Sequence, residues 1–237
     1  MTTVHATGFS IPGQLESQGF AIVPDVLPPG LVDELTQQIG FALTRRASDS
    51  SYAMRHLAQV VPAVQQLAQS AFARSLVEPV MGREASLVRS LFFDKTAEAN
   101  WKVAWHQDLT IAVREKIDLP GFSAWSVKDG VAHVQPPVAV LERLLTVRFH
   151  LDDCDLANGP LQVMPGSHNS GRLSAAQISE WGGKSIACTV RRGGALLMRP
   201  LLLHSSSAAR TPRHRRVVHL EFAGEALPGG LKWLQAS

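Results

Sequence analysis

The stretch KVAWHQDLTIA, residues 102–112, places His106 and Asp108 two positions apart, between the apolar residues Trp105 and Leu109. Side chains at i and i+2 of a β-strand point to the same face, so the pair would project together. An imidazole and a carboxylate, with a second imidazole from elsewhere, make the facial triad that binds Fe(II) and leaves coordination positions open. The stretch therefore predicts a strand that carries two ligands of a metal site.

The His106–Asp108 motif cannot identify the metal site alone, because the chain contains a second pair with the same spacing. The chain has 9 histidines, and about 0.4 such pairs are expected by chance at this composition. His150 and Asp152 are also two positions apart. Either pair by itself is better explained as a hydrogen-bonded surface or core pair. A third ligand is available in His204, which ends the apolar run ALLMRPLLLH and would sit at the mouth of a strand.

The segment after His204 supplies a cation. A polar connection, SSSAARTPRH, leads to a strand that starts at Arg215. If this connection is a roughly symmetric hairpin loop, His204 and Arg215 lie opposite each other on one face, and Arg216 faces the other way. A guanidinium beside an iron site suits a bidentate grip on a carboxylate. A surface arginine on a basic hairpin is the alternative.

The spacing of apolar residues changes at Gly82. Before it, apolar residues recur at helical spacing in two longer stretches and a short third one: Leu31, Leu35, Ile39, Ala42; Val61, Val64, Leu67, Ala71, Phe72. After it the period is 2, and turn residues separate the runs. The predicted strands are 19–26, 85–93, 101–109, 144–152, 159–165, 185–190, 194–200 and 215–223. The pattern predicts one α+β domain over 1–237, with helices at about 28–82 packed on one face of a β-sandwich core at about 85–224.

Composition excludes several classes of protein. A net charge of +3, from 23 basic and 20 acidic residues, is too balanced for a nucleic-acid or anionic-membrane partner, and RTPRHRR (210–216) is a patch typical of a solvated hairpin. No apolar run is long enough to span a membrane. The start, MTTVHATGFSIPGQ, has no leader-peptide pattern. Cys154 and Cys188 lack CxxC spacing and are expected to be reduced, so we expect a soluble cytoplasmic protein.

Over roughly residues 15–225 the sequence resembles the phytanoyl-CoA dioxygenase family of Fe(II)- and 2-oxoglutarate-dependent oxygenases. Four segments carry the resemblance: LESQGFAIVPDVLPPGLVDEL, LFFDKTAEANWKVAWHQD, LDDCDLANGPLQVMPGSH and GGALLMRPLLLHSSSAARTPRHRR. The resemblance implies a double-stranded β-helix, a jelly-roll barrel with iron at its open end. It also implies that Fe(II), 2-oxoglutarate and O2 are used to hydroxylate an unactivated C–H bond of a small molecule, with release of succinate and CO2.

The resemblance also implies roles for individual residues. His106, Asp108 and His204 match the iron ligands. Because the carboxylate ligand is present, hydroxylation is favoured over halogenation. The residues that match contacts to 2-oxoglutarate are Arg215, on its far carboxylate, Ser206 near the same group, and Lys95.

Arg148 departs from the family pattern, because many relatives carry tryptophan there. An arginine that points into a barrel needs an anionic partner or a cage of hydrogen bonds. That partner could be 2-oxoglutarate, an acidic group of the substrate, or a buried acid such as Asp152 or Glu221. His150 and Asp152 fall on the strand before the DDCDLANG turn, which argues against a metal role, and His168 is expected to be structural.

Residues 113–142 form a long, irregular, proline-containing interval, and such loops are commonly functional. We expect a lid and substrate wall, with Trp125, Lys128, His133 and Gln135 as candidate contacts, although each could be an exposed loop residue. A small-molecule substrate, with an anionic group as one option, is the expected partner.

Two other functions remain open. A non-catalytic metal-binding jelly roll, acting as a sensor, would keep the triad and lose the cosubstrate pocket. Lys95, Ser206 and Arg215 all being in place counts against it. A scaffold that acts through protein contacts at 210–216 would not need His106 or Asp108.

Overall fold

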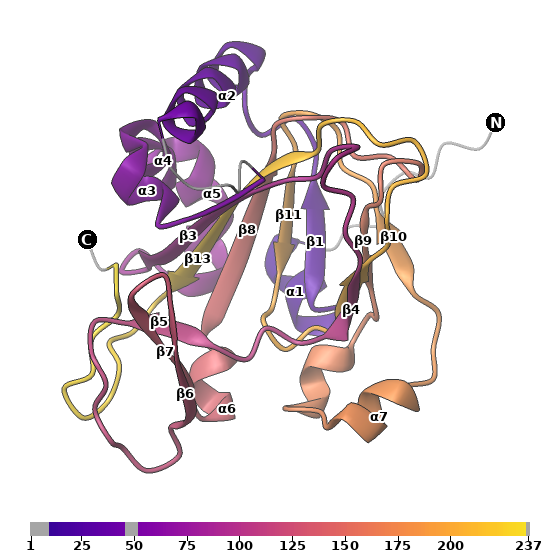
Figure 1. The fold of residues 1–237 in the computed structure, drawn as a ribbon. Helices are drawn as coiled ribbons and strands as arrows, with labels where there is room; N and C mark the ends of the chain where they lie inside the picture. Colours follow the sequence, from indigo (N-terminus) through magenta and orange to yellow (C-terminus); the bar gives the residue numbers. More distant parts are fainter. Residues whose placement is uncertain (1–9, 46–51, 236–237) are drawn as a thin grey trace.

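The structure is a computed structural model that describes residues 10–45 and 52–235 of the 237 in the chain. The stretch without a leader-peptide pattern, residues 1–14, therefore lies mostly outside the described residues. Figure 1 shows two large sheets that face each other, a smaller sheet of β5, β6 and β7 below the larger one, and helices packed outside.

The largest sheet has six strands in the order β1-β11-β8-β13-β3-β2, all paired antiparallel. Its strands are β1 (Phe20–Val23), β2 (Ala53–Arg55), β3 (Ser86–Asp94), β8 (Leu144–His150), β11 (Ala195–Met198) and β13 (Arg216–Ala223). The facing sheet has the order β10-β9-β12-β4, also antiparallel. Its strands are β4 (Val103–His106), β9 (Leu161–Val163), β10 (Ile186–Cys188) and β12 (His204–Ser206). This pair of sheets confirms the predicted double-stranded β-helix.

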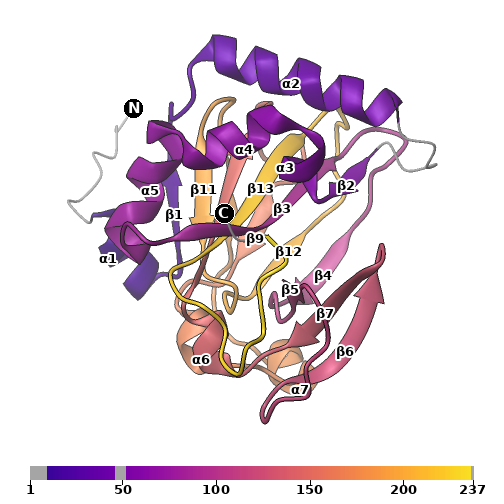
Figure 2. The same ribbon diagram turned by 90° about the vertical axis from the view of Figure 1, so that its left-hand side faces the viewer.

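Helices cover the outer face of the six-stranded sheet (Figure 2). They are α1 (Ile11–Ser17), α2 (Pro29–Thr44), α3 (Leu57–Val60), α4 (Pro62–Gln69) and α5 (Ala71–Met81). Proline opens α2 and α4, where its missing N–H costs nothing, and Gly82 ends α5 with φ of 82°. Two short helices, α6 (Val138–Leu141) and α7 (Ala175–Ser179), and a 3₁₀ turn (Ser167–Ser170) lie elsewhere. No helix among the described residues is long and apolar enough to cross a membrane.

Strand β8 shows why the site lies inside this fold. Every residue of LLTVRFH is buried, because the strand is covered on both faces. Leu145, Val147 and Phe149 pack into the core shared with the helices. Since side chains alternate along a strand, Arg148 and His150 project from the opposite face, toward the second sheet. One face of β8 thus stabilises the fold, and the other supplies charged groups to the interior.

Several predicted element boundaries are wrong. The helical stretch from Val61 to Phe72 is divided, because Ser70 leaves the helix and caps α5 through its hydroxyl. The strand predicted at 101–109 ends at His106. Strands β2 and β12, each of three residues, carry too short a pattern to be recognised.

The interval 113–142 is not irregular, contrary to expectation. It contains β6 (Ser123–Lys128) and β7 (Val131–Gln135), which form a three-stranded antiparallel sheet with β5 (Ile111–Val113), followed by α6. The C-terminal segment anchors this sheet, because Val113 bridges to Trp233. The alternation was hidden from sequence reading because β6 is largely exposed.

The double-sided burial of β8 predicts an asymmetric response to truncation of phenylalanine. Phe149 is 0% exposed, so Phe149→Ala should lower the free energy of unfolding by about 3–5 kcal/mol through lost burial and a cavity. Phe41 is 63% exposed, so Phe41→Ala should change it by less than about 0.5 kcal/mol. Urea denaturation followed by circular dichroism measures both. Equal effects would contradict the assignment of Phe149 to the core.

Candidate metal centre

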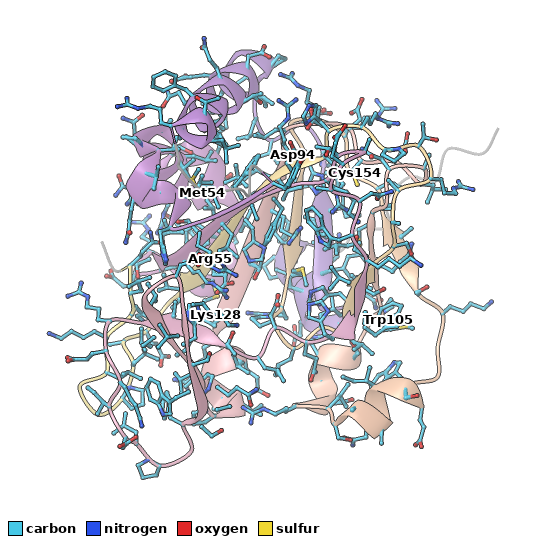
Figure 3. The ribbon with its side chains drawn as sticks, viewed as in Figure 1. Met54, Arg55, Asp94, Trp105, Lys128 and Cys154 are labelled. Carbon is cyan, nitrogen blue, oxygen red and sulfur yellow. The ribbon has the colours of Figure 1, made fainter. Side chains whose placement is uncertain are left out.

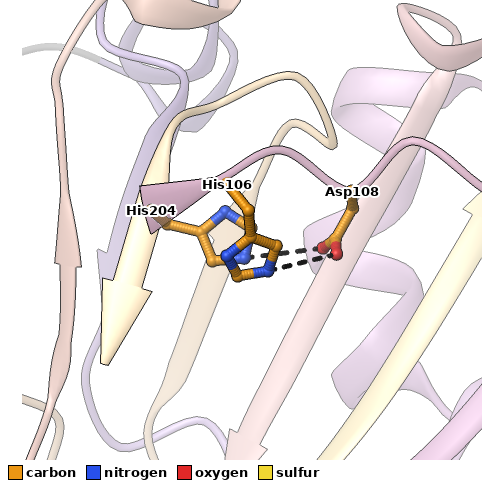
Figure 4. A group of neighbouring side chains, drawn as sticks. All are labelled: His106, Asp108 and His204. Atoms are coloured by element: carbon orange, nitrogen blue, oxygen red, sulfur yellow. Dashed lines mark ion pairs between the residues drawn. The ribbon is translucent and has the colours of Figure 1, made fainter. Parts of the chain in front are cut away.

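Two adjacent strands and the turn after one of them bring together His106, Asp108 and His204 (Figure 4). His106 and His204 are register partners on β4 and β12, with ring centroids 4.2 Å apart. Asp108 lies two residues beyond the end of β4. Its Oδ1 is 3.8 Å from His106 Nε2, and its Oδ2 is 3.7 Å from His204 Nε2.

The backbone holds Asp108 in place without a strand. Its N–H donates to the carbonyl of Pro200 at 2.9 Å. The preceding side chain, Gln107, is buried and turned the other way, where its amide donates to the carbonyls of Gly171 and Leu201. The expected same-side projection of the pair is therefore achieved, but by these hydrogen bonds rather than by strand pleating.

Both histidines present the same ring nitrogen to the carboxylate. His106 Nδ1 lies 2.8 Å from the carbonyl of Ala104, and His204 Nδ1 lies 2.8 Å from the carbonyl of Leu202. A carbonyl can only accept, so each neutral ring carries its proton on Nδ1 and has a lone pair on Nε2. Such a backbone contact is the usual way in which a metal-binding imidazole is oriented.

The three side chains fit a metal ion. Their candidate ligand atoms all lie within 4.8 Å of one another, and among the residues that the structure describes they form the one such group of His, Cys, Asp or Glu. Neighbouring ligands at about 2.1 Å from a metal are roughly 3 Å apart, so shifts under about 1 Å would complete the site. The His204 side chain is 5% exposed, and those of His106 and Asp108 are 38% and 32% exposed. One side of the triad is thus open.

Protonation also suits metal binding. Burial lowers the pKa of His204 to about 4, so this ring is neutral at pH 7. Burial by itself would raise the pKa of Asp108, but the neighbouring imidazoles, His204 first, hold it below its ordinary value. A neutral imidazole and an ionised carboxylate are the forms that bind metal.

A cluster of buried cationic side chains, Lys95 and Arg215 with Ser206 between them, lies in the same interior. Lys95 Nζ donates to Ser206 Oγ at 3.0 Å and to the carbonyl of Ser207 at 2.7 Å. Arg215 Nη1 and Ser206 Oγ both donate to the carbonyl of Gly159. Burial, and then the charge of Arg215, lower the pKa of Lys95 to about 8. The structure therefore brings together the three residues that the family resemblance assigned to the cosubstrate.

Gly159 is a residue next to this cluster that sequence reasoning missed. Its φ is +62°, and a Cβ there would lie 2.7 Å from the carbonyl oxygen of Ser207. Only glycine permits this close approach, which gives Ser206 and Arg215 a common acceptor. The preceding Asn158 is fully buried. The sequence NGP, residues 158–160, was the local signal for this position.

The connection from His204 to Arg215 is not a hairpin, contrary to expectation. Strand β12 pairs with β4 and β9, whereas β13 pairs with β3 and β8. The connection therefore crosses from one sheet to the other. Arg216 faces away from the interior, as expected, and forms a bidentate pair with Asp152 at 2.6 and 2.8 Å.

This pairing separates the two residues of the rival motif, His150 and Asp152. Asp152 belongs to Arg216, while His150 is buried in the interior with neither ring nitrogen hydrogen-bonded. The suggestion that Arg148 pairs with Asp152 or Glu221 is wrong. Arg148 Nη1 instead lies 2.8 Å from Nδ1 of His219, a residue without a role in the sequence-based prediction.

The candidate substrate residues are scattered. His133 is buried, and its pKa is lowered by burial, with Arg89 adding to the effect. Trp125 and Gln135 are half-buried. Lys128 is exposed, and Figure 3 shows it well separated from Trp105, the neighbour of His106.

His168 contacts the carbonyl of Glu16 through Nε2 at 3.1 Å. It also packs against Gly19, where an added Cβ would lie 2.5 Å from His168 Nδ1. This contact joins the 3₁₀ turn to the end of α1, which is the kind of structural placement that the sequence suggested.

The chain is similar in sequence and in fold to known proteins. The phytanoyl-CoA dioxygenase (PhyH) family model matches residues 15–217. No curated protein sequence matches the chain. EctD from S. alaskensis, solved with 2-oxoglutarate and 5-hydroxyectoine, has a TM-score of 0.69 and 21% identity, covering 89% of this chain and 73% of that chain.

Two further solved structures are similar. SnoN, a non-heme alpha ketoglutarate dependent epimerase from nogalamycin biosynthesis, has a TM-score of 0.68 and 18% identity, covering 95% of this chain and 92% of its own. HygX from Streptomyces hygroscopicus, solved with nickel and 2-oxoglutarate, has a TM-score of 0.65 and 16% identity, covering 88% and 84%. At such identities these structures support the fold.

The geometry predicts which histidines bind metal. Asp108→Ala and His204→Ala should each weaken Fe(II) binding about 100-fold or more, because one of three ligands is lost. His150→Ala should leave Fe(II) affinity unchanged, since its partner carboxylate is held by Arg216. Anaerobic calorimetric titration of the apoprotein measures all three. Loss of binding in His150→Ala alone would mean that the other motif holds the metal.

Proposed function

Because the chain belongs to the phytanoyl-CoA dioxygenase family, we propose that it is an Fe(II)- and 2-oxoglutarate-dependent dioxygenase. Its proposed reaction is hydroxylation of an unactivated C–H bond of a small-molecule metabolite, with release of succinate and CO2. The observation that carries this proposal is that the space between the two sheets contains both a partly exposed His–Asp–His triad and a cluster of buried cationic side chains.

The donor set of the triad fits Fe(II). His106, Asp108 and His204 would hold the ion by two imidazole nitrogens and a carboxylate oxygen, on one face. Bound together, iron and 2-oxoglutarate supply the oxidising chemistry, and the protein supplies position and shielding. The carbonyls of Ala104 and Leu202 keep both rings turned toward the ion.

The charge of the cationic cluster suits the dianionic cosubstrate. Arg215 would bind its far carboxylate, with Ser206 and Lys95 completing the contact. Arg215 Nε is buried and has no hydrogen-bond partner, which is costly unless a ligand supplies one. Gly159 has no Cβ, so its backbone can lie close to that of Ser207 and the three donors can converge.

The interior walls would exclude water from the reacting centre. Strands β8, β13 and β3 form one wall, and β12, β4 and β9 form the other. The sheet of β5, β6 and β7 follows the metal-binding segment in the chain, lies below the larger sheet (Figure 1) and is the candidate substrate wall. A non-catalytic metal-binding protein would have no need of a buried lysine and arginine beside the triad, so that alternative is disfavoured.

Anaerobic absorption spectroscopy tests the proposal. Addition of Fe(II) and then 2-oxoglutarate should produce the weak visible charge-transfer band of the chelate. Arg215→Gln should weaken 2-oxoglutarate binding roughly ten- to hundredfold, because a charge-assisted bidentate contact is lost. Fe(II) affinity should not change. Arg213→Gln is the matched control, since Arg213 is an exposed arginine that pairs with Asp155.

Wild-type protein that binds Fe(II) but shows no band would contradict the oxygenase proposal and favour the metal-binding alternative. Succinate release in air, once a substrate is found, provides the corresponding test of turnover.

Cosubstrate binding should also depend on pH through Lys95. Its pKa is lowered to about 8, and the ammonium form attracts the dianion. Bound 2-oxoglutarate favours the protonated form, so affinity should be highest below pH 8 and fall as pH rises through about 8. Lys95→Met should weaken binding and flatten this profile. Lys128→Met, at an exposed lysine, should leave the profile intact. A profile unchanged in Lys95→Met would exclude contact with the cosubstrate.

A further inference from the structure

Arg148 is a buried cation with an unused hydrogen-bonding edge. It is 8% exposed and projects from β8 into the interior. Nη1 lies 2.8 Å from His219 Nδ1, and the Phe93 ring lies 5.6 Å from Cζ. Its Nε is buried without a partner, and in the described part of the chain no hydrogen bond to Nη2 occurs. Nε and Nη2 together form the side-on edge with which arginine grips a carboxylate.

Among the described residues no carboxylate forms an ion pair with Arg148, although the charge of Asp108, a candidate metal ligand, acts to raise its pKa. A guanidinium can only donate, so His219 Nδ1 accepts and the ring is neutral with its proton on Nε2. That Nε2 donates to Glu221 Oε1 at 3.1 Å. The same oxygen accepts from Arg89 Nη1 at 3.0 Å. Glu221 is therefore matched by Arg89, and a neutral imidazole separates it from Arg148.

A charge count of the interior leads to the same result. Four cationic side chains project into the interior or toward it: Arg89, Lys95, Arg148 and Arg215. Two carboxylates do the same, those of Asp108 and Glu221. Fe(II) and 2-oxoglutarate carry opposite charges of equal size, so their binding leaves the excess unchanged. Burial, and then repulsion from Arg215, lower the pKa of Arg148 to about 10, which still leaves it charged at pH 7. An unmatched buried cation is costly unless a ligand pairs with it.

The proposed function assigns a partner to each of the two carboxylates of 2-oxoglutarate. Arg215, Ser206 and Lys95 suit the far one, and the metal would bind the near one. Arg148 is thus available for a third carboxylate. His150 offers further capacity, because it follows on the same face of β8 and both its ring nitrogens are buried without a partner.

We propose that the prime substrate is a small carboxylic acid, and that Arg148 binds its carboxylate through the Nε–Nη2 edge. This inference rests on the proposed oxygenase function and names the substrate class. His219 is a positioning residue, since its bond to Nη1 turns the free edge of Arg148 into the interior.

The first arm of the test asks whether Arg148 belongs to the cosubstrate. The anaerobic Fe(II) protein is titrated with 2-oxoglutarate, and the chelate band is followed in wild type, Arg148→Gln, Arg148→Lys and the control Arg213→Gln. The dissociation constant for 2-oxoglutarate should change less than about twofold in every variant. A loss of tenfold or more in Arg148→Gln would overturn the proposal and assign Arg148 to the cosubstrate.

The second arm uses acids and their neutral amides as probes. Hexanoate with hexanamide, and phenylacetate with phenylacetamide, are titrated calorimetrically into the anaerobic Fe(II)–2-oxoglutarate protein. Wild type and Arg213→Gln should bind at least one acid about tenfold or more tightly than its amide, as a charge-assisted pair predicts. Arg148→Gln should abolish this preference. Arg148→Lys, which keeps the charge and loses the bidentate edge, should retain part of it.

The outcomes separate the two proposals. A chelate band in wild type with no preference for either acid, or with a preference that survives Arg148→Gln, would overturn the substrate assignment and leave the oxygenase function standing. The absence of a band in wild type would remove the oxygenase function itself, and the substrate assignment would fall with it. Arg148→Lys keeps the test decisive if Arg148→Gln does not fold.

Discussion

The organisation of this protein depends on the burial of positive charge inside a barrel. Lys95, Arg148 and Arg215 are all nearly inaccessible to water, although a buried cation is unfavourable unless it is paired. The fold must therefore be stabilised by the other face of the same strands. In β8 and β13 that face is apolar and packs under α2–α5, so the hydrophobic core can offset an interior that is arranged for ligands.

The two facing sheets divide the chemistry between them. The four-stranded sheet presents the triad, because β4 and β12 are neighbours and their histidines are in register. The six-stranded sheet presents Arg148 and His219, and its β3 and β13 lead directly to Lys95 and Arg215. The crossing from β12 to β13 carries the chain between the sheets. In the proposed function, a metal at one wall and cations at the other would bind the two ends of one dianion.

Much of the site was predictable from local sequence and from family resemblance. The HxD spacing, the histidine at the end of an apolar run and the period-2 strands all had local signals, and the resemblance to oxygenases supplied the cationic residues. Two expectations and one of the alternatives for Arg148 were wrong for one reason. The supposed hairpin after His204, the irregular interval 113–142 and the pairing of Arg148 with Asp152 or Glu221 each depend on which segments lie side by side. Pairing partners far apart in the chain leave no local periodicity.

The sequence by itself determined the class of fold, because alternation is a property of neighbouring residues, and its resemblance to the oxygenase family singled out the three candidate ligands from two possible His–Asp pairs. Only the tertiary structure decided that Asp152 pairs with Arg216 and that Glu221 pairs with Arg89. Those pairings leave His150 and Arg148 without a carboxylate. The physical reason is that a salt bridge is selected by proximity in space, and β3, β8 and β13 come from separate regions of the chain.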